Sequence, residues 1–177
     1  MNTFLSRLNA MFAFSLSVTA GVTFACFLTT HFNDNREDVS IDINRIIVKN
    51  MEEFYVGQKH DLGHLQFSLK ANMTPVFNWN CKQLFLYLLA EYETTKNKVN
   101  QVVLWDKIIM RGQDANLNIN KMNTKYYFFD DGSDLRGRKV TLSLHWNVIP
   151  NSGYLWRVRG NGNLTITVPD AYGTSRI

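Results

Sequence analysis

The chain has 177 residues, of which 45% are hydrophobic, and a formal net charge of +4 at pH 7. Its basic residues are spread along the sequence without a basic run, so nothing in the charge pattern supports a nucleic-acid partner. There are two cysteines, Cys26 and Cys81, and only Cys81 lies beyond the apolar N-terminal segment. The rest of the chain must therefore be held by its core, without an internal disulfide.

The N-terminal segment from Ala10 to Phe32 contains no Lys, Arg, Asp or Glu. As a helix it would be about 35 Å long, enough to cross a hydrocarbon core of about 30 Å. Arg7 precedes it, and the net-negative residues 33–38 follow it. Because positive charge stays in the cytoplasm, we expect residues 1–9 to be cytoplasmic, 10–32 to be a transmembrane signal-anchor helix, and 33–177 to lie across the membrane.

A cleaved signal peptide is the alternative interpretation of the same segment. Val18-Thr19-Ala20 before Gly21 is an acceptable cleavage site, and cleavage there would leave an apolar region of ordinary length. The uncut run exceeds the roughly 7–15 residues of a signal peptide, which favours a retained anchor.

Small residues recur at every fourth position of the segment. They share one face of a helix, and such faces allow transmembrane helices to pack closely. We therefore expect a membrane helix-packing face, although apolar helices rich in Ala, Ser and Thr also show this spacing by chance. Its members are Ala13, Ser17, Gly21, Ala25 and Thr29.

Beyond the anchor the hydrophobic period is two, which predicts half-buried strands. Alternating runs occupy residues 39–43, 65–73, 140–148 and 164–168. Two denser apolar runs, 84–92 and 102–110, are typical of strands covered on both faces, although 84–92 could also form a short helix. Turn signals fall at Asn97, Asp114, 130–132, 151–153 and 160–162. About seven strands in one domain of residues 33–177 predict an all-β fold, an antiparallel β-sandwich.

Catalytic residues are hard to find. Ser143 and His145 would share one face of a strand, but the two positions are about 7 Å apart, and a nucleophile needs a base within hydrogen-bond reach and a third group to orient that base. We expect the polar, exposed face of a strand here, and therefore no catalytic residue. A hydrolase built on this pair is a rival hypothesis.

Metal ligands are equally sparse. His60 and His64 have zinc-binding spacing only on a helix, and Gly63 with the adjacent strand pattern argues against a helix. Asp130, Asp131 and Asp134 do not match a calcium loop and favour a hairpin turn. We expect no metal site and no cofactor.

The remaining signals concern surfaces. Among the aromatic residues, Trp156 beside Arg157 and Arg159 is the best candidate for an exposed patch that meets a partner. Asn163-Leu164-Thr165 is a glycosylation sequon, and we expect Asn163 to be the acceptor unless its strand buries it. The sequon at Asn72 is followed by Pro75, which impairs acceptance.

Several stretches in order resemble one family. They are the start (MNTFLSRLNAMFAFSLSV), residues 82–92 (KQLFLYLLAEY), residues 100–108 (NQVVLWDKI), residues 128–132 (FFDDG), and residues 140–142 with 146–151 (VTL, WNVIPN). Over residues 1 to about 153 the chain resembles subunit 3 of the eukaryotic signal peptidase complex. Two departures matter: Lys139 stands where many animal members carry a sequon, and Cys81 replaces an expected aliphatic residue, where it would pack as a small hydrophobe.

The resemblance implies a single-pass type II protein of the endoplasmic reticulum membrane with a lumenal β-sandwich. The expected glycoprotein rests on the sequon at Asn163, because Lys139 excludes the family's own glycan. The resemblance also implies a non-catalytic scaffold whose partners are the catalytic serine-protease subunit, the other membrane subunits and membrane lipids. A membrane-tethered binding or adhesion module is the alternative that the sandwich alone would allow.

Overall fold

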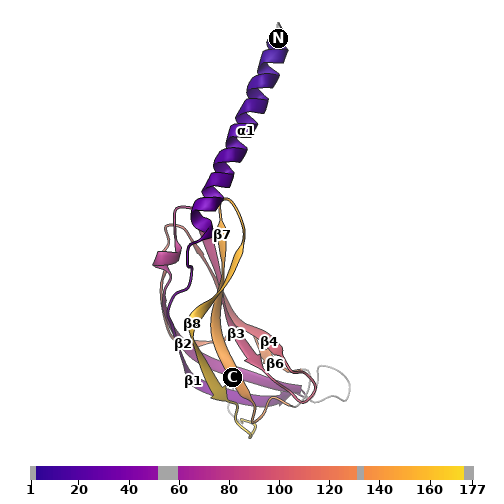
Figure 1. The fold of residues 1–177 in the computed structure, drawn as a ribbon. Coiled ribbons are helices and arrows are strands. Elements are labelled where there is room, and N and C mark those ends of the chain that lie inside the picture. Colours follow the sequence, from indigo (N-terminus) through magenta and orange to yellow (C-terminus); the bar gives the residue numbers. More distant parts are fainter. Residues whose placement is uncertain (1–2, 52–59, 131–133, 174–177) are drawn as a thin grey trace.

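A computed structural model describes residues 3–51, 60–130 and 134–173 and shows a single long helix joined to a β-sandwich (Figure 1). In chain order the elements are α1 (Phe4–His31), β1 (Val39–Met51), β2 (His60–Asn72), the 3-10 turn η1 (Thr74–Val76), β3 (Cys81–Tyr92), β4 (Asn100–Met110), β5 (Asn116–Asn123), β6 (Phe128–Phe129), β7 (Lys139–Pro150) and β8 (Trp156–Thr167).

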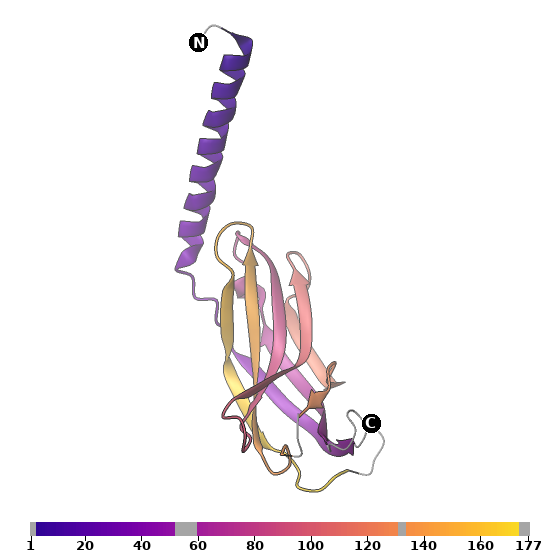
Figure 2. The same ribbon diagram turned by 90° about the vertical axis from the view of Figure 1, so that its right-hand side faces the viewer.

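Helix α1 projects away from the sandwich as one rod (Figures 1 and 2). It is the one described helix that is long and apolar enough to cross a membrane, and the central part of its surface is uncovered by the rest of the chain. Thr3 caps its start, since its hydroxyl accepts a hydrogen bond from the Ser6 amide at 3.3 Å. Hydroxyls along the rod bond back to helix carbonyls, as Ser17 does to Ala13 at 2.9 Å, which reduces their cost in an apolar medium.

Two antiparallel sheets form the sandwich, which confirms the predicted fold class. One has the order β1-β2-β5, with β6 paired to β2, and the other has the order β4-β3-β7-β8. Their facing sides bury a continuous core that includes Phe67 and Leu69 from the first sheet and Leu86, Leu88 and Trp146 from the second. This core holds the domain together, because Cys26 and Cys81 are both free.

The densest predicted run is the strand β3, at the centre of its sheet between β4 and β7, so the helix alternative for residues 84–92 is wrong. Burial on both sides explains its near-continuous apolar sequence. The strand β5 was missed because its sequence, NLNINKMN, looks polar. Leu117 is the one residue of β5 that is buried; Ile119 is half-buried against the core.

The predicted turn at residues 160–162 is wrong, since these residues lie inside β8 at a β-bulge opposite β7. Gly162 has φ +130°, and a Cβ there would collide with the Val39 backbone. The bulge lets the Asn161 amide donate to the Glu37 carbonyl at 2.9 Å. The short segment between α1 and β1 is thereby fastened to the edge of β8.

Two aromatic residues of the second sheet lie on opposite faces. Trp105 belongs to the core and meets Phe67 edge-on, with ring centroids 6.0 Å apart. Tyr87 is buried but outside the core cluster, because it lies on the outer face and stacks on Phe85 at 5.7 Å. Only the first ring fills space between the sheets.

We therefore predict that Trp105→Ala lowers the free energy of unfolding by about 3–5 kcal/mol, the usual cost of a large core cavity. The exposed ring of Tyr127 offers a matched control, and Tyr127→Ala should change stability by less than about 0.5 kcal/mol. The measurement is urea unfolding of the full chain in detergent, followed by circular dichroism. Equal losses in the two variants would contradict the core assignment.

Candidate functional site

The serine and histidine of β7 are in contact. Ser143 Oγ and His145 Nε2 lie 3.0 Å apart, within hydrogen-bond distance. The expectation that same-face positions would hold these groups out of reach is therefore wrong, because the imidazole is long enough to fold back along the strand. The β-bulge in β8 falls opposite this pair, where the register shifts between Ser143 and His145.

The surroundings of the pair are those of a packed sheet face. Ser143 is 3% exposed, and the imidazole of His145 stacks on Tyr87 with ring centroids 5.5 Å apart. The Tyr87 hydroxyl accepts a hydrogen bond from Arg157 Nε at 3.0 Å. Among the described residues, no acidic side chain is hydrogen-bonded to His145, so the orienting member of a triad is not in place.

The surroundings of His145 disfavour its protonated form, mainly through burial. Burial lowers the pKa of His145 below its usual 6.5, Arg159 and Arg157 lower it further, and Glu91 opposes them. A neutral imidazole could act as a base, but a substrate carbonyl could not reach the buried Ser143 hydroxyl without opening the sheet face. The side chains of Arg157, Tyr87, His145 and Ser143 contact one another in this order across the outer face of β3, β7 and β8. Their arrangement is that of surface packing and not of a catalytic site.

The neighbouring part of the same face is apolar and exposed. Val103, Ile108 and Met110 of β4 are 37%, 49% and 55% exposed, respectively. In the register of the sheet Ile108 is paired with Phe85 of β3, so it lies beside the Phe85–Tyr87 stack. Asp106 is paired with Tyr87 and separates Val103 from Ile108 on this face. We call these five residues, Phe85, Tyr87, Val103, Ile108 and Met110, the outer patch.

The outer face of the other sheet is different. Where β1, β2 and β5 lie side by side, its paired positions are polar: Ser40 with Lys70, Asp42 with Ser68, and Lys70 with Asn118. The two sides of the sandwich therefore offer partners very different surfaces. The outer patch is the stronger candidate for a protein interface, because apolar side chains gain most from burial.

The predicted absence of a metal site stays a prediction. His60 and His64 lie on the strand β2, about 13 Å apart by strand geometry, and not on a helix. Asp130 accepts a hydrogen bond from Tyr92 at 2.8 Å, and Asp134 accepts from the Thr95 hydroxyl at 2.5 Å. Asp131 lies outside the described residues. Within residues 3–51, 60–130 and 134–173 no group of three His, Cys, Asp or Glu side chains could hold a metal ion.

Sequence reasoning missed one buried charge. Asp61, fully buried on β2, accepts hydrogen bonds from the Tyr172 hydroxyl at 2.9 Å and the Leu135 amide at 3.2 Å. Arg136 lies 3.9 Å from its carboxylate and covers the Tyr172 ring at 4.3 Å. These contacts tie the C-terminal segment to the first sheet. An acidic residue at the start of a strand gave no sign of this role.

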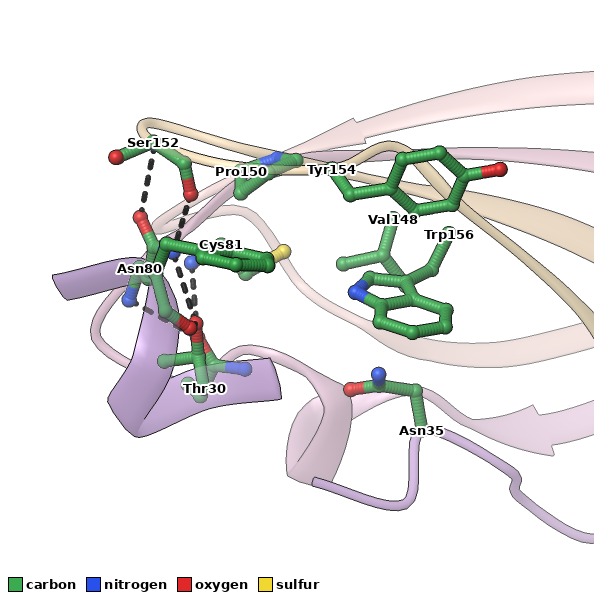
Figure 3. Close-up of a pocket in the computed structure, with 11 residues that line it drawn as sticks. Thr30, Asn35, Asn80, Cys81, Val148, Pro150, Ser152, Tyr154 and Trp156 are labelled. Atoms are coloured by element: carbon green, nitrogen blue, oxygen red, sulfur yellow. Dashed lines mark hydrogen bonds between the residues drawn. The ribbon is translucent and has the colours of Figure 1, made fainter. Parts of the chain in front are cut away.

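The other end of the sandwich meets α1. Asn80, before β3, donates through Nδ2 to Thr30 Oγ1 at 3.0 Å and to the Ser152 carbonyl at 2.8 Å, as Figure 3 shows. Its Oδ1 accepts from the Ser152 amide at 3.1 Å. Trp156 is half-buried here, with its ring 5.2 Å from that of His31. The aromatic residue expected to be exposed therefore stabilises the junction between helix and sandwich.

Both sequon asparagines are exposed. Asn163 lies on β8, the edge strand of its sheet, so the expectation that the strand might bury it does not apply. Asn72 ends β2, and its Oδ1 accepts a hydrogen bond from the Thr74 amide at 3.1 Å, just before Pro75.

Comparison with known proteins gives the family. The family model for "Signal peptidase subunit" matches residues 1–171. The chain is 52% identical to "Signal peptidase complex subunit 3" of Homo sapiens over 97% of each chain, and 52% identical to the protein of that name from Drosophila melanogaster over 100% of each chain. It is also 50% identical to "Adipocyte-related X-chromosome expressed sequence 1" of Mus musculus over 97% of each chain. The chain belongs to the signal peptidase subunit family.

The two departures from the pattern expected of the signal peptidase subunit family have simple structural settings. Lys139 begins β7 and is paired with Thr167 of β8. Cys81 is buried in the core cluster, as expected for a small hydrophobe, and burial raises the pKa of its thiol to about 11.

His145 should make stability depend on pH. Its folded-state pKa is below the unfolded value of 6.5, so the unfolded chain binds a proton more readily. The contribution of the neutral imidazole to the free energy of unfolding is fully present above about pH 6.5, the unfolded-state pKa. It is lost as the pH falls toward the lower, folded-state pKa. We expect wild type to lose more stability between about pH 7.5 and pH 5.5 than His145→Gln does. Urea midpoints of both proteins at the two pH values test this, and parallel losses would contradict it.

Proposed function

We propose that this chain is a non-catalytic scaffold subunit of a signal peptidase complex in the endoplasmic reticulum membrane. Family membership supports the complex, and the outer patch supports the scaffold role. In this proposal α1 anchors the chain with residues 1–9 in the cytoplasm and the sandwich in the lumen. The outer patch braces the serine-protease subunit that removes signal sequences, and other membrane subunits pack along α1.

The small-residue face of α1 fits the last part of this proposal. Ala13, Ser17, Gly21 and Ala25 are all exposed in the isolated chain, and nothing lies within 4 Å of a Cβ placed at Gly21. A close approach by another helix is therefore possible along this face.

A hydrolase built on Ser143 is the rival function, and the 3.0 Å contact with His145 is the observation in its favour. The near-complete burial of Ser143 weighs against it. The scaffold and the hydrolase predict opposite consequences for substitutions on the two parts of this sheet face.

We predict that Ile108→Glu lowers recovery of the assembled complex, because a carboxylate placed in the outer patch would be buried unpaired against the partner. Precursor processing should fall with the amount of complex. The measurements are affinity recovery of the complex from cells that carry the variant and the fraction of a secretory precursor that is cleaved.

Two variants serve as controls in the same cells. Asn118→Glu adds the same charge to the polar outer face of the other sheet and should change neither measurement. Ser143→Ala removes the only nucleophile of the pair and should also leave processing unchanged. Loss of cleavage in Ser143→Ala at normal complex levels would overturn the scaffold and establish the hydrolase.

Orientation has its own test. We propose that Asn163 carries a glycan and Asn72 does not, since Asn163 lies exposed on an edge strand and Pro75 follows the other sequon. Glycosidase treatment should increase gel mobility of wild type but not of Asn163→Gln. A glycosylated Asn163 requires a lumenal sandwich. An unchanged mobility of wild type would refute modification at this position.

A further inference from the structure

The turn between β7 and β8 lies beside α1 and not beyond its end. Ser152 Oγ donates a hydrogen bond to the Thr23 carbonyl at 2.9 Å. The next residue, Gly153, lies against the ring of Phe27 so closely that a Cβ would collide with it. Figures 1 and 2 both show this turn level with the last turns of the helix.

This overlap limits where the hydrocarbon core can end. Thr23 precedes His31 by about 12 Å along the helix, at 1.5 Å per residue. If hydrocarbon extended to Phe32, as the charge-free run predicts, the contact of the turn with Thr23 would lie about 13 Å inside the lipid. Residues 151–155 are irregular backbone, and lipid-exposed irregular backbone does not occur within the hydrocarbon core. The apolar span must therefore end near Thr23.

The helix is long enough to satisfy this limit at its other end. From Phe4 to Thr23 there are about 20 residues, which form about 30 Å of helix and match the hydrocarbon thickness. Arg7 then lies within about one turn of the cytoplasmic boundary, where its side chain can extend to the headgroups.

The side chains at this end of the sandwich suit the membrane interface. Trp79, Tyr154 and Leu155 are 60%, 63% and 49% exposed, respectively. They come from the two turns that Asn80 and Ser152 join through their hydrogen bonds. Trp and Tyr favour the headgroup region because their rings are apolar at one end and polar at the other. No acidic or basic residue occurs in residues 77–81 or 150–155.

We propose that the α1-proximal end of the sandwich is seated in the headgroup layer of the lipid bilayer. Trp79, Tyr154 and Leu155 contact lipid, the helix from Phe24 to His31 lies at the same level, and the hydrocarbon span is residues 4–23 in place of 10–32. This rests on the proposed insertion of α1, but not on any role in the complex.

Spin labels on the full chain in phosphatidylcholine liposomes test the proposal. The background is Cys26→Ala; Cys81 can remain, because it is buried and the high pKa of its thiol keeps it unreactive near neutral pH. Labels at Phe14→Cys and Gly21→Cys form a matched pair, since positions seven apart share one helix face.

A second pair of labels tests the turn. Leu155→Cys reports the turn between β7 and β8, and Val99→Cys is its control, because Val99 is exposed between β3 and β4 at the opposite end of β3. Resistance to carbonate extraction first establishes that α1 is inserted.

Oxygen concentrates at the bilayer centre, whereas a nickel chelate stays in water. We expect the oxygen-to-nickel accessibility ratio to be higher at residue 14, near the middle of 4–23, than at residue 21, near the middle of 10–32. At residue 155 the ratio should be several-fold above that at residue 99. An oxygen-to-nickel ratio higher at residue 21 than at residue 14 would overturn the proposal. A label at residue 155 that is as water-accessible as the label at residue 99 would also overturn it. A residue 155 label that is water-accessible in liposomes and shielded only in the assembled complex would also overturn it, in favour of a protein contact.

Discussion

The side-chain amide of Asn80 fixes how the sandwich is joined to the helix. Its nitrogen donates to Thr30 Oγ1 and to the Ser152 carbonyl, and its oxygen accepts from the Ser152 amide. The backbone carbonyl of Asn80 accepts from the Asn151 amide at 2.8 Å. The residue is buried, and an amide left buried without partners costs about 1–3 kcal/mol. Of these bonds the one to Thr30 reaches α1, and Ser152, which Asn80 holds in place, donates through Oγ to the Thr23 carbonyl of the helix at 2.9 Å. Displacing the helix would break both of these bonds. The position of the helix relative to the sandwich therefore depends on the same hydrogen bonds that hold the β7–β8 turn against the start of β3.

The segment that follows the helix strengthens this coupling. Trp146, from the centre of the core, donates through Nε1 to the Asn35 carbonyl at 3.1 Å. The backbone amide of Asn161, in the β8 bulge, donates to the Glu37 carbonyl at 2.9 Å. The seven residues 32–38 between the helix and the first strand would ordinarily be a flexible tether. Here their backbone groups are paired with the sandwich, so the outer patch keeps a fixed direction relative to α1. The proposed scaffold role requires this fixed direction.

Much of the fold could be predicted from the sequence because burial leaves a periodic pattern. The alternating runs in β1, β2, β7 and β8 follow from one covered face, and the dense run in β3 follows from two. The dense run in β4 was wrongly expected to be covered on both faces, because Val103, Ile108 and Met110 leave its outer face apolar but exposed. The strand β5 could not be found, since a single fully buried residue, Leu117, leaves no period. The bulge at residues 160–162 resembled a turn because both conformations favour glycine. In the structure Gly162 is required because the Val39 backbone lies against it, a contact that the local sequence does not reveal. Asn80 and Asp61 have roles that depend on partners far away in sequence, for which local patterns carry no signal.

The Ser143–His145 pair shows why proximity alone does not identify a catalytic site. Two residues on one strand face can meet when one side chain is long and folds back, as His145 does, but a nucleophile also needs access and an oriented base. In this chain the pair belongs to a stack that continues through Tyr87 to Arg157, with rings and hydrogen bonds that hold each side chain in place. Side chains already fixed in this way lose little entropy when a partner covers them. In the proposed scaffold, the same contacts that bury the Ser143 hydroxyl would therefore pre-organise the sheet face beside the outer patch for a partner.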